Sequence, residues 1–258
     1  QLVWSLARAI YAGVKWLTFA SYPPPDGTSA LRIAGYLLAW PGMNAKAFWD
    51  RQTEVPRPEI GEWLFAIFKV SLGLAIAAIA VPLLLPEYPL AAGWAAMVGV
   101  VFILHFGILH LLSLAWRAAG VNAEPIMQWP ILASSVSDFW GKRWNMAFRD
   151  LSFTYVLRPL AMHWGTVPAM LGVFLLSGLV HDVIITLPTG ATFGGPTLYF
   201  VIQGVGMVAE RSEFGRRWSL DSGITGRLFG YLVIVGPVGL LFPEPFVRLG
   251  VLPLVTGF

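Results

Sequence analysis

Two groups of polar residues interrupt an otherwise apolar chain, and the types and spacing of their side chains could support chemistry. The first is residues 137–151, which read Ser-Asp-Phe-Trp-Gly-Lys-Arg-Trp-Asn-Met-Ala-Phe-Arg-Asp-Leu. A helix turns by about 100° per residue, so this segment would place four polar side chains on one stripe and four apolar ones opposite: Asp138, Lys142, Asn145 and Arg149 against Trp140, Trp144, Ala147 and Leu151. We therefore expect an amphipathic helix here, with Ser137 as its cap.

This amphipathic segment has two interpretations. It is typical of an interfacial helix, whose tryptophans lie among lipid headgroups while its basic side chains reach into water. The segment also suits an anion-binding site. In that case Lys142, Arg143 and Arg149 contact the ligand, and Asn145 faces the site where the reaction takes place. Phosphate is the anion expected there, because the arginine fork matches phosphate oxygens in geometry and charge.

The second group is Ser177, His181 and Asp182, near the end of a long uncharged stretch. An aspartate inside a membrane helix costs about 2.5 to 3.5 kcal/mol on insertion scales, so such residues are functional candidates. Ser177 lies one helical turn before His181, and Gly178 would let another helix or a substrate approach closely. Histidine accepts a proton near neutral pH, which suits general-base chemistry. The alternative is a helix-end pair that lipid headgroups satisfy.

Composition predicts the kind of element that must position these groups. Apolar residues make up 57% of the 258 residues and charged residues 12%, with a mean hydropathy of +0.69. A soluble domain carries about 25% charged residues, so most of this surface is expected to face lipid. The formal charge of +3 is too small and dispersed for a nucleic-acid-binding surface. The absence of cysteine excludes disulfides and thiolate metal sites.

Uncharged stretches predict the membrane helices, because a span needs about 20 mostly apolar residues. Five such stretches are residues 70–86, 88–116, 159–180, 183–209 and 228–242, and the first extends back to Trp63 if Lys69 is tolerated near its end. Proline and glycine residues between 188 and 196 divide the fourth stretch between two helices. Pro237 is expected to kink the last one.

Two earlier stretches, residues 2–20 and 31–49, are marginal spans or interfacial helices. The sequence thus predicts an all-α, polytopic integral membrane protein with about seven transmembrane or interfacial helices. We expect a single membrane domain over residues 1–258, divided into N-terminal marginal spans (1–62), a helical hairpin (63–116), an amphipathic cytosolic segment (117–165) and C-terminal catalytic spans (166–258). Gln1 is not an initiator methionine, which leaves open what precedes it, and no cleavable signal peptide is visible.

The distribution of basic residues sets the expected orientation. The turn near Pro86 and the connection 188–196 contain no lysine or arginine, whereas the loops on the opposite side are rich in them. Because cytoplasmic loops carry the excess of lysine and arginine, we expect the basic side, including residues 117–158, in the cytosol.

Three blocks of the sequence, in this order and at this separation, resemble the wax synthase branch of the membrane-bound O-acyltransferase (MBOAT) superfamily. They are Ser-Asp-Phe-Trp-Gly-Lys-Arg-Trp-Asn at 137–145, Phe-Leu-Leu-Ser-Gly-Leu-Val-His-Asp at 174–182, and Leu-Tyr-Phe-Val-Ile-Gln-Gly-Val-Gly-Met-Val-Ala-Glu at 198–210. The resemblance extends roughly from Glu124 to the C-terminus. It implies an MBOAT-like membrane fold and acyl transfer from acyl-CoA to a hydroxyl in a membrane-buried tunnel.

The resemblance assigns the two marked polar positions of the family to Asn145 and His181, with Asp182 beside the histidine. Two residues depart from the family pattern. The family commonly has Glu after the histidine, where this chain has Asp182, and often has His before Gly204, where this chain has Gln203. These departures keep the central pair in place and leave the acceptor alcohol open.

The expected reaction needs no cofactor and no metal, because acyl-CoA is a substrate. His181 would take the alcohol proton as the oxygen attacks the thioester, and Asn145 would donate a hydrogen bond to the developing oxyanion. We expect the CoA phosphates at Lys142, Arg143 and Arg149. The further substrate-binding candidates are Asp138, Trp140, Trp144, Ser177 and Gln203. A covalent intermediate on Ser177 is formally allowed but not required.

Two other function classes fit parts of the sequence. His105 and His110 have the spacing of a histidine box in a di-iron lipid desaturase or hydroxylase, but such a site needs many imidazoles and the chain has four histidines. A transporter or channel could use His181 and Asp182 as a proton site. Against the transporter hypothesis, the sequence shows no inverted repeat, and a transporter would leave the amphipathic segment without a role.

We therefore predict an acyl-CoA-dependent O-acyltransferase that esterifies a long-chain alcohol to a wax ester. A sterol, a diglyceride or a hydroxylated natural product would use the same residues. The expected partners are acyl-CoA, a hydroxylated lipid-like acceptor and membrane lipids, with no nucleic acid, and the sequence does not indicate an oligomeric state. The membrane would be the plasma membrane in a bacterium and the endoplasmic reticulum in a eukaryote.

Overall fold

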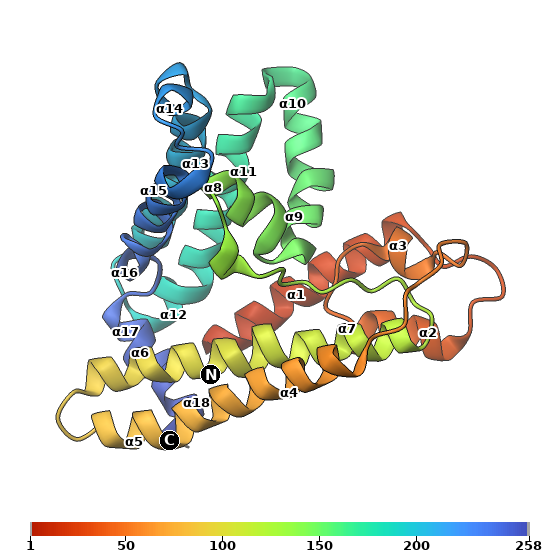
Figure 1. Ribbon diagram of the computed structural model, residues 1–258, viewed down its shortest axis with the longest axis horizontal. Helices are drawn as coiled ribbons and strands as arrows, with labels where there is room; N and C mark the ends of the chain where they lie inside the picture. Colours follow the sequence, from red (N-terminus) through yellow and green to blue (C-terminus); the bar gives the residue numbers. More distant parts are fainter. Residues whose placement is uncertain (1, 257–258) are drawn as a thin grey trace. The chain divides into compact units, whose positions relative to one another are not determined.

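The computed structural model describes residues 2–256, and every regular element in that range is a helix (Figure 1). The all-α prediction is therefore confirmed. The described residues form two compact units, which we describe one at a time. The first unit contains residues 2–7, 128–144 and 152–250, and the second contains residues 8–127, 145–151 and 251–256.

The second unit contains the expected helical hairpin. Its helices are most of α1 (Leu2–Ser21), α2 (Ala30–Ala34), α3 (Ala45–Trp49), α4 (Ile60–Ala75), α5 (Val81–Leu84), α6 (Pro89–Val100), α7 (Leu109–Ala118), most of α9 (Met146–Ser152) and α18 (Leu252–Thr256). π-Helical turns join α4 to α5 and α6 to α7, so each arm of the hairpin is one continuous helix (Figure 1). The arms approach closely at Gly73, where an added Cβ would lie 2.6 Å from the carbonyl oxygen of Gly99.

Aromatic side chains form the hydrophobic core of the second unit. Tyr36, Phe48 and Trp49 are each at most 5% exposed and their rings are in mutual contact. The buried Lys15 ammonium lies 3.3 Å from the centre of the Tyr36 ring and donates a hydrogen bond of 2.6 Å to the carbonyl oxygen of Gly42. These contacts fix the loop that follows Trp40, because a buried ammonium needs both partners.

The first unit is built around two long helices, α11 (Thr166–His181) and α13 (Gly195–Arg211). The others are α8 (Val136–Asp138), α10 (Arg158–Trp164), α12 (Leu187–Thr189), α14 (Glu213–Arg217), α15 (Gly223–Val235), α16 (Val238–Leu241) and α17 (Glu244–Phe246). At the crossing of α11 and α13, a Cβ on Gly178 would lie 2.5 Å from Cα of Thr197. Gly178 therefore permits the close helix approach that the sequence predicted.

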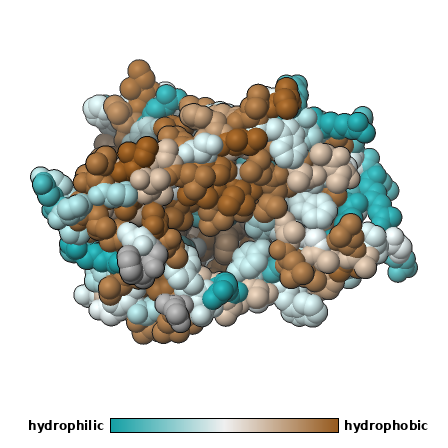
Figure 2. All heavy atoms as spheres, turned by 90° about the horizontal axis from the view of Figure 1, so that it is seen from below, coloured by the Kyte–Doolittle hydropathy of each residue, from teal (hydrophilic) through white to brown (hydrophobic). Residues whose placement is uncertain are grey.

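Four helices in the described part of the chain are long and apolar enough to cross a membrane: Ile60–Leu84, Pro89–Ala118, Thr166–Thr189 and Gly223–Leu241. Only 17% of the most apolar window in each of the first two is buried, so most of these apolar side chains need lipid around them. Apolar residues, in brown, cover broad areas of the face in Figure 2. Residues 2–21, 30–39 and 195–211 form helices outside this group of four, so the count of seven spans stays a prediction.

The amphipathic segment is helical but is not one continuous helix, which corrects our expectation for residues 137–151. It consists of α8, a π-helical turn over Phe139–Arg143, a break at Trp144 and Asn145, and α9. Asn145 has a positive φ of 48°. A residue in this left-handed region ends a right-handed helix, and asparagine tolerates it better than most residues do. The predicted cap is also wrong: the cap is Ser135, two residues before Ser137, and its side chain accepts a hydrogen bond of 3.0 Å from the Asp138 amide.

Candidate active site

His181 lies at the end of α11 in the first unit, where one hydrogen bond fixes its ring. Nδ1 lies 2.7 Å from the carbonyl oxygen of Ser177, one turn earlier in the helix. A carbonyl oxygen can only accept, so Nδ1 must carry the proton and donate it. The neutral ring then has its lone pair on Nε2, which is the atom available to take a proton from a substrate.

The ring of His181 is held by apolar neighbours. Its centre lies 4.6 Å from that of Phe200 on α13. Phe200 also contacts the indole of Trp140, at 5.6 Å between ring centres. Aromatic contacts at these separations add stability beyond area burial and restrict ring orientation.

Asp182 is fully buried, and its carboxylate connects α11 to the start of α13. It accepts hydrogen bonds from the Gly194 and Thr197 amides, at 2.8 and 2.9 Å, and from the hydroxyls of Thr186 and Thr197. Four donors satisfy a buried carboxylate. The sequence grouped Asp182 with the catalytic residues; in the structure its carboxylate oxygens bond to these donors, and the ring of His181 makes its hydrogen bond to the Ser177 carbonyl oxygen.

Trp140 and Gln203 meet inside the first unit, as two of the substrate-binding candidates. The Trp140 indole nitrogen donates to Oε1 of Gln203 at 3.2 Å, and Nε2 of Gln203 donates to the carbonyl oxygen of Val233 at 2.8 Å. Gln203 is completely buried. This amide therefore joins the π-helical turn, α13 and α15, and brings the amphipathic segment against the helix that carries Phe200.

Of the three predicted phosphate ligands, Arg143 is already engaged within its own unit. Its Nε lies 2.5 Å from Oδ2 of Asp138, and its Nη1 donates to the carbonyl oxygens of Gln128 and Trp129. Burial alone would raise the pKa of Asp138, but hydrogen bonds from Ser134 and Arg143 outweigh it and hold this pKa below its ordinary value. Asp138 is thus ionised and partly neutralises Arg143. Lys142 is exposed and remains the more accessible cation.

Glu210 was not among the predicted site residues and appears in the sequence only as the last residue of the block 198–210. It is 1% exposed, and its carboxylate accepts hydrogen bonds of 2.9 Å from the backbone amides of Val136 and Ser137. These are orphan donors at a helix start, where negative charge is favourable. Glu210 thereby attaches the beginning of the amphipathic segment to α13. Trp144 directly follows the π-helical turn Phe139–Arg143, and its ring stacks on Phe139, with ring centres 5.5 Å apart.

Asn145 and Arg149 belong to the second unit. The side-chain oxygen of Asn145 accepts a hydrogen bond of 3.4 Å from the Phe148 amide. The backbone amide of Asn145 donates to the sulfur of Met127 at 3.2 Å. Arg149 is half-exposed and pairs with Asp150 at 3.1 Å.

The remaining histidines have different surroundings. Nδ1 of His110 lies 2.8 Å from Nζ of Lys69, which is on the facing arm of the hairpin. His163 is exposed on α10. Among the described residues, no group of three or more His, Asp or Glu side chains is arranged to hold a metal ion.

Comparison with known proteins places this region in a family. Residues 123–202 match the model described as "Membrane bound O-acyl transferase family", and this range contains Trp140, Asn145 and His181. The three blocks that resembled the wax synthase branch begin in this range, and the resemblance is confirmed.

Curated relatives carry names from the same branch. A probable long-chain-alcohol O-fatty-acyltransferase of Arabidopsis thaliana is 33% identical over 52% of this chain and 43% of its own length. The long-chain-alcohol O-fatty-acyltransferase of Simmondsia chinensis is 30% identical over 60% of this chain and 49% of its own length. An acyl-CoA–sterol O-acyltransferase of Arabidopsis thaliana is 27% identical over 55% and 46%. The matches thus span about half the length of these relatives.

Proposed function

We propose that this chain, whose residues 123–202 match the membrane-bound O-acyltransferase family, acts as a member of that family and transfers a fatty acyl group from acyl-CoA to a hydroxyl acceptor. The acceptor we propose is a long-chain alcohol, which gives a wax ester. The names of the relatives support this choice, because several of them are long-chain-alcohol O-fatty-acyltransferases.

The observation that carries the proposal is the hydrogen bond from His181 to the Ser177 carbonyl oxygen. It fixes the proton on Nδ1 and leaves Nε2 as a base, inside a helix long and apolar enough to span a membrane. A hydroxyl is a weak nucleophile, so its attack on a thioester needs such a base. Phe200 and Asp182 hold the base in place, one through the ring and the other through the helix end.

The reaction balances without a cofactor or a metal. The alcohol oxygen bonds to the thioester carbonyl carbon while Nε2 of His181 takes the hydroxyl proton, which gives a tetrahedral oxyanion and an imidazolium. The carbon–sulfur bond then breaks, and the imidazolium returns its proton to the leaving CoA thiolate. From the family resemblance alone we propose that the NH₂ group of Asn145 donates a hydrogen bond to the oxyanion.

The amphipathic segment is the proposed entry for CoA. Lys142 is exposed beside Arg143, and phosphate oxygens would complete the coordination of both cations. Trp140, Trp144 and Gln203 would line the approach to His181, and Ser177 would act through its backbone carbonyl. We propose an integral membrane location with the basic loops in the cytosol, in the plasma membrane of a bacterium or the endoplasmic reticulum of a eukaryote.

A product screen tests this function. The purified chain in phospholipid vesicles is supplied with one acyl-CoA and a mixture of long-chain alcohol, sterol and diglyceride, and the esters are identified by mass spectrometry. We expect an ester of the long-chain alcohol, formed only when both acyl-CoA and chain are present. An ester of the sterol alone would correct the acceptor, and the absence of every ester would refute the transferase.

A further inference from the structure

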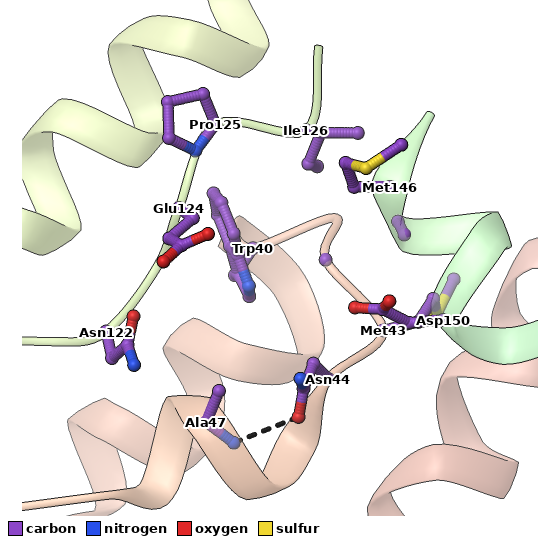
Figure 3. A pocket seen from close by; sticks show the side chains of 12 residues that line it. Trp40, Met43, Asn44, Ala47, Asn122, Glu124, Pro125, Ile126, Met146 and Asp150 are labelled. Atoms are coloured by element: carbon purple, nitrogen blue, oxygen red, sulfur yellow. Dashed lines mark hydrogen bonds between the residues drawn. The ribbon is translucent and has the colours of Figure 1, made fainter. Parts of the chain in front are cut away.

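A pocket in the second unit lies outside the machinery described so far. Its volume is about 200 Å³, and it is lined by the loop around Trp40 and Asn44, the segment around Asn122 and Glu124, and the side of α9 that carries Asp150 (Figure 3). Drug-sized ligands occupy pockets of about 300 to 1,000 Å³. The size of this one therefore suits a small headgroup or a single polar molecule.

The walls of this pocket are held by hydrogen bonds, one of which is buried. Lys15 donates to the carbonyl oxygen of Gly42, and the Asn44 side chain accepts a hydrogen bond of 3.0 Å from the Ala47 amide. The amide of Met146 donates to the carbonyl oxygen of Ile126 at 2.9 Å, which ties α9 to the opposite wall. A pocket whose walls are fixed in this way loses little conformational entropy when a ligand binds.

The charge of the lining is one-sided. Glu124 and Asp150 are acidic, Asn44 and Asn122 are carboxamides, and none of the described lining residues is lysine, arginine or histidine. Burial raises the pKa of Asp150 and the charge of Glu124 raises it further, although Arg149 and Asn44 oppose both effects. Asp150 is already paired with Arg149 at 3.1 Å, so the charge of the pocket comes chiefly from Glu124, and a cation beside these two carboxylates would be stabilised.

The rest of the lining favours an organic cation over a metal ion. The pocket is bordered by the indole of Trp40 and by the apolar side chains of Met43 and Met146 (Figure 3). Calcium would need six to eight oxygen ligands, and magnesium a near-ideal octahedron of them. An ammonium group instead pairs with carboxylates while its methyl or methylene groups contact sulfur and indole.

We propose that this pocket binds the ammonium group of a small organic cation, such as the choline or ethanolamine group of a lipid headgroup or the same amine in free form. Glu124 and Asp150 pair with its charge, and the ring of Trp40 contacts its carbon atoms. The proposal does not depend on the acyltransferase activity, because it rests on the pocket alone.

Calorimetric titration of the purified chain in detergent tests the charge requirement. The probes are choline, its uncharged tert-butyl analogue dimethylbutanol, glycerol and calcium chloride. We expect choline to bind saturably, and the uncharged analogue to bind at least about tenfold more weakly, since it lacks the charge that the carboxylates and the indole ring attract. Equal binding of dimethylbutanol or glycerol, or binding of calcium alone, would overturn the proposal.

Isosteric variants place the binding in this pocket. Glu124→Gln changes an exposed side chain and should not affect folding, while Asp150→Asn removes the partly buried charge. Each should weaken choline binding by about tenfold. The matched control is Glu244→Gln, an exposed carboxylate on α17 that pairs with Arg248, which should bind choline as the wild type does. Unchanged affinity in the Glu124 variant, or equal loss in the control, would contradict the assignment.

A lipid arm distinguishes the two sources of the ammonium group. The wild type and Glu124→Gln are purified from nanodiscs of phosphatidylcholine mixed with phosphatidylglycerol, and the retained lipids are identified by native mass spectrometry. Selective retention of phosphatidylcholine by the wild type would identify a headgroup ligand, and no selectivity together with choline binding would identify a free amine. Selective retention of phosphatidylglycerol would contradict the proposal.

Discussion

At the scale of single residues, the two nitrogens of His181 have different tasks because of one hydrogen bond. Nδ1 donates to the Ser177 carbonyl oxygen at 2.7 Å, so Nε2 holds the lone pair. The neighbouring Asp182 is occupied by donors from the loop and start of α13 and does not compete for this proton. A helix backbone thus performs the ring-orienting task that a carboxylate performs in many hydrolytic sites.

The first prediction concerns the pH dependence of transfer. His181 acts as a base only when it is neutral, so activity should fall as the pH drops through its pKa in the enzyme, by about tenfold per pH unit well below that value. The measurement is kcat/KM for the alcohol at saturating acyl-CoA, in vesicles. His163→Ala, which changes an exposed histidine on α10, should keep the same profile. A flat profile in the acidic range would contradict a histidine base.

The second prediction separates Lys142 from Arg143. Lys142 is exposed, whereas Arg143 is paired with Asp138 and with two backbone carbonyls. Lys142→Ala should therefore raise the KM for acyl-CoA by about fivefold to tenfold, the effect of one charge-assisted phosphate contact, and leave the KM for the alcohol unchanged. Arg143→Ala should in addition lower the thermal stability. If acyl-CoA kinetics are unchanged in both variants, this segment is a lipid anchor.

At the scale of elements, the crossing of α11 and α13 sets the position of His181 relative to Phe200. Gly178 allows the contact, Asp182 joins the ends of the two helices, and Gln203 links α13 to α15. All three residues are completely or nearly completely buried. The crossing therefore tolerates little added volume.

The third prediction tests this crossing. Gly178→Ala would place a Cβ 2.5 Å from Cα of Thr197, so the helices must separate, at a cost of about 1 to 3 kcal/mol. The variant should show a lower unfolding temperature in detergent and reduced kcat. Gly239→Ala is the matched control, since no atom lies within 4 Å of the Cβ it would add. Equal effects of the two substitutions would show that helix packing at residue 178 is unimportant.

Hydrophobicity was sufficient to predict the long helices but not the local breaks. The hairpin turn near Pro86, the interruption before α13 and the bend at Pro237 follow from proline, glycine and the loss of apolar periodicity. The break at Asn145 does not, because a helical wheel assumes one φ throughout, and contacts such as that of Asn145 with Met127 lie outside the local pattern. The one local signal for this break was Asn145 itself, because asparagine is common where a helix ends in the left-handed conformation.

The candidate site was predicted in part for the same reason. His181 stood out as an ionisable residue within an apolar stretch, and its hydrogen bond to Ser177 is compatible with the base role that we propose. The partners of Asp182, Arg143 and Glu210 lie on segments distant in sequence, so spacing alone could not identify them. The pocket of Glu124 and Asp150 also joins distant segments and was missed.

At the scale of the whole molecule, the exposed apolar surface requires a membrane. The four candidate spans are mostly unburied, and their exposed side chains include Leu64, Leu83, Leu187 and Leu232. The connection between Thr189 and Gly195 contains no charged residue, whereas the short helix α14, which follows α13, contains Arg216 and Arg217. This contrast supports opposite sides of the membrane for the two connections.

The fourth prediction is a topology test, which the absence of native cysteine makes simple. In sealed vesicles with the cytosolic side outward, a cysteine at the exposed Thr192 should resist a membrane-impermeant maleimide until detergent is added. A cysteine at Glu213, exposed on α14, should react at once. Rapid labelling of the cysteine at residue 192 in intact vesicles would contradict the proposed orientation.

The most direct test of the central claim is alcohol-dependent release of CoA by wild type and His181→Ala. Both are purified, reconstituted in the same vesicles and compared for acyl-CoA binding, so that a loss of folding is separated from a loss of chemistry. We predict that the variant binds acyl-CoA normally and loses about 100- to 10,000-fold in turnover, while His163→Ala keeps most of its activity. If His181→Ala retains more than about a tenth of wild-type turnover, an effect far below that range, His181 is not the base.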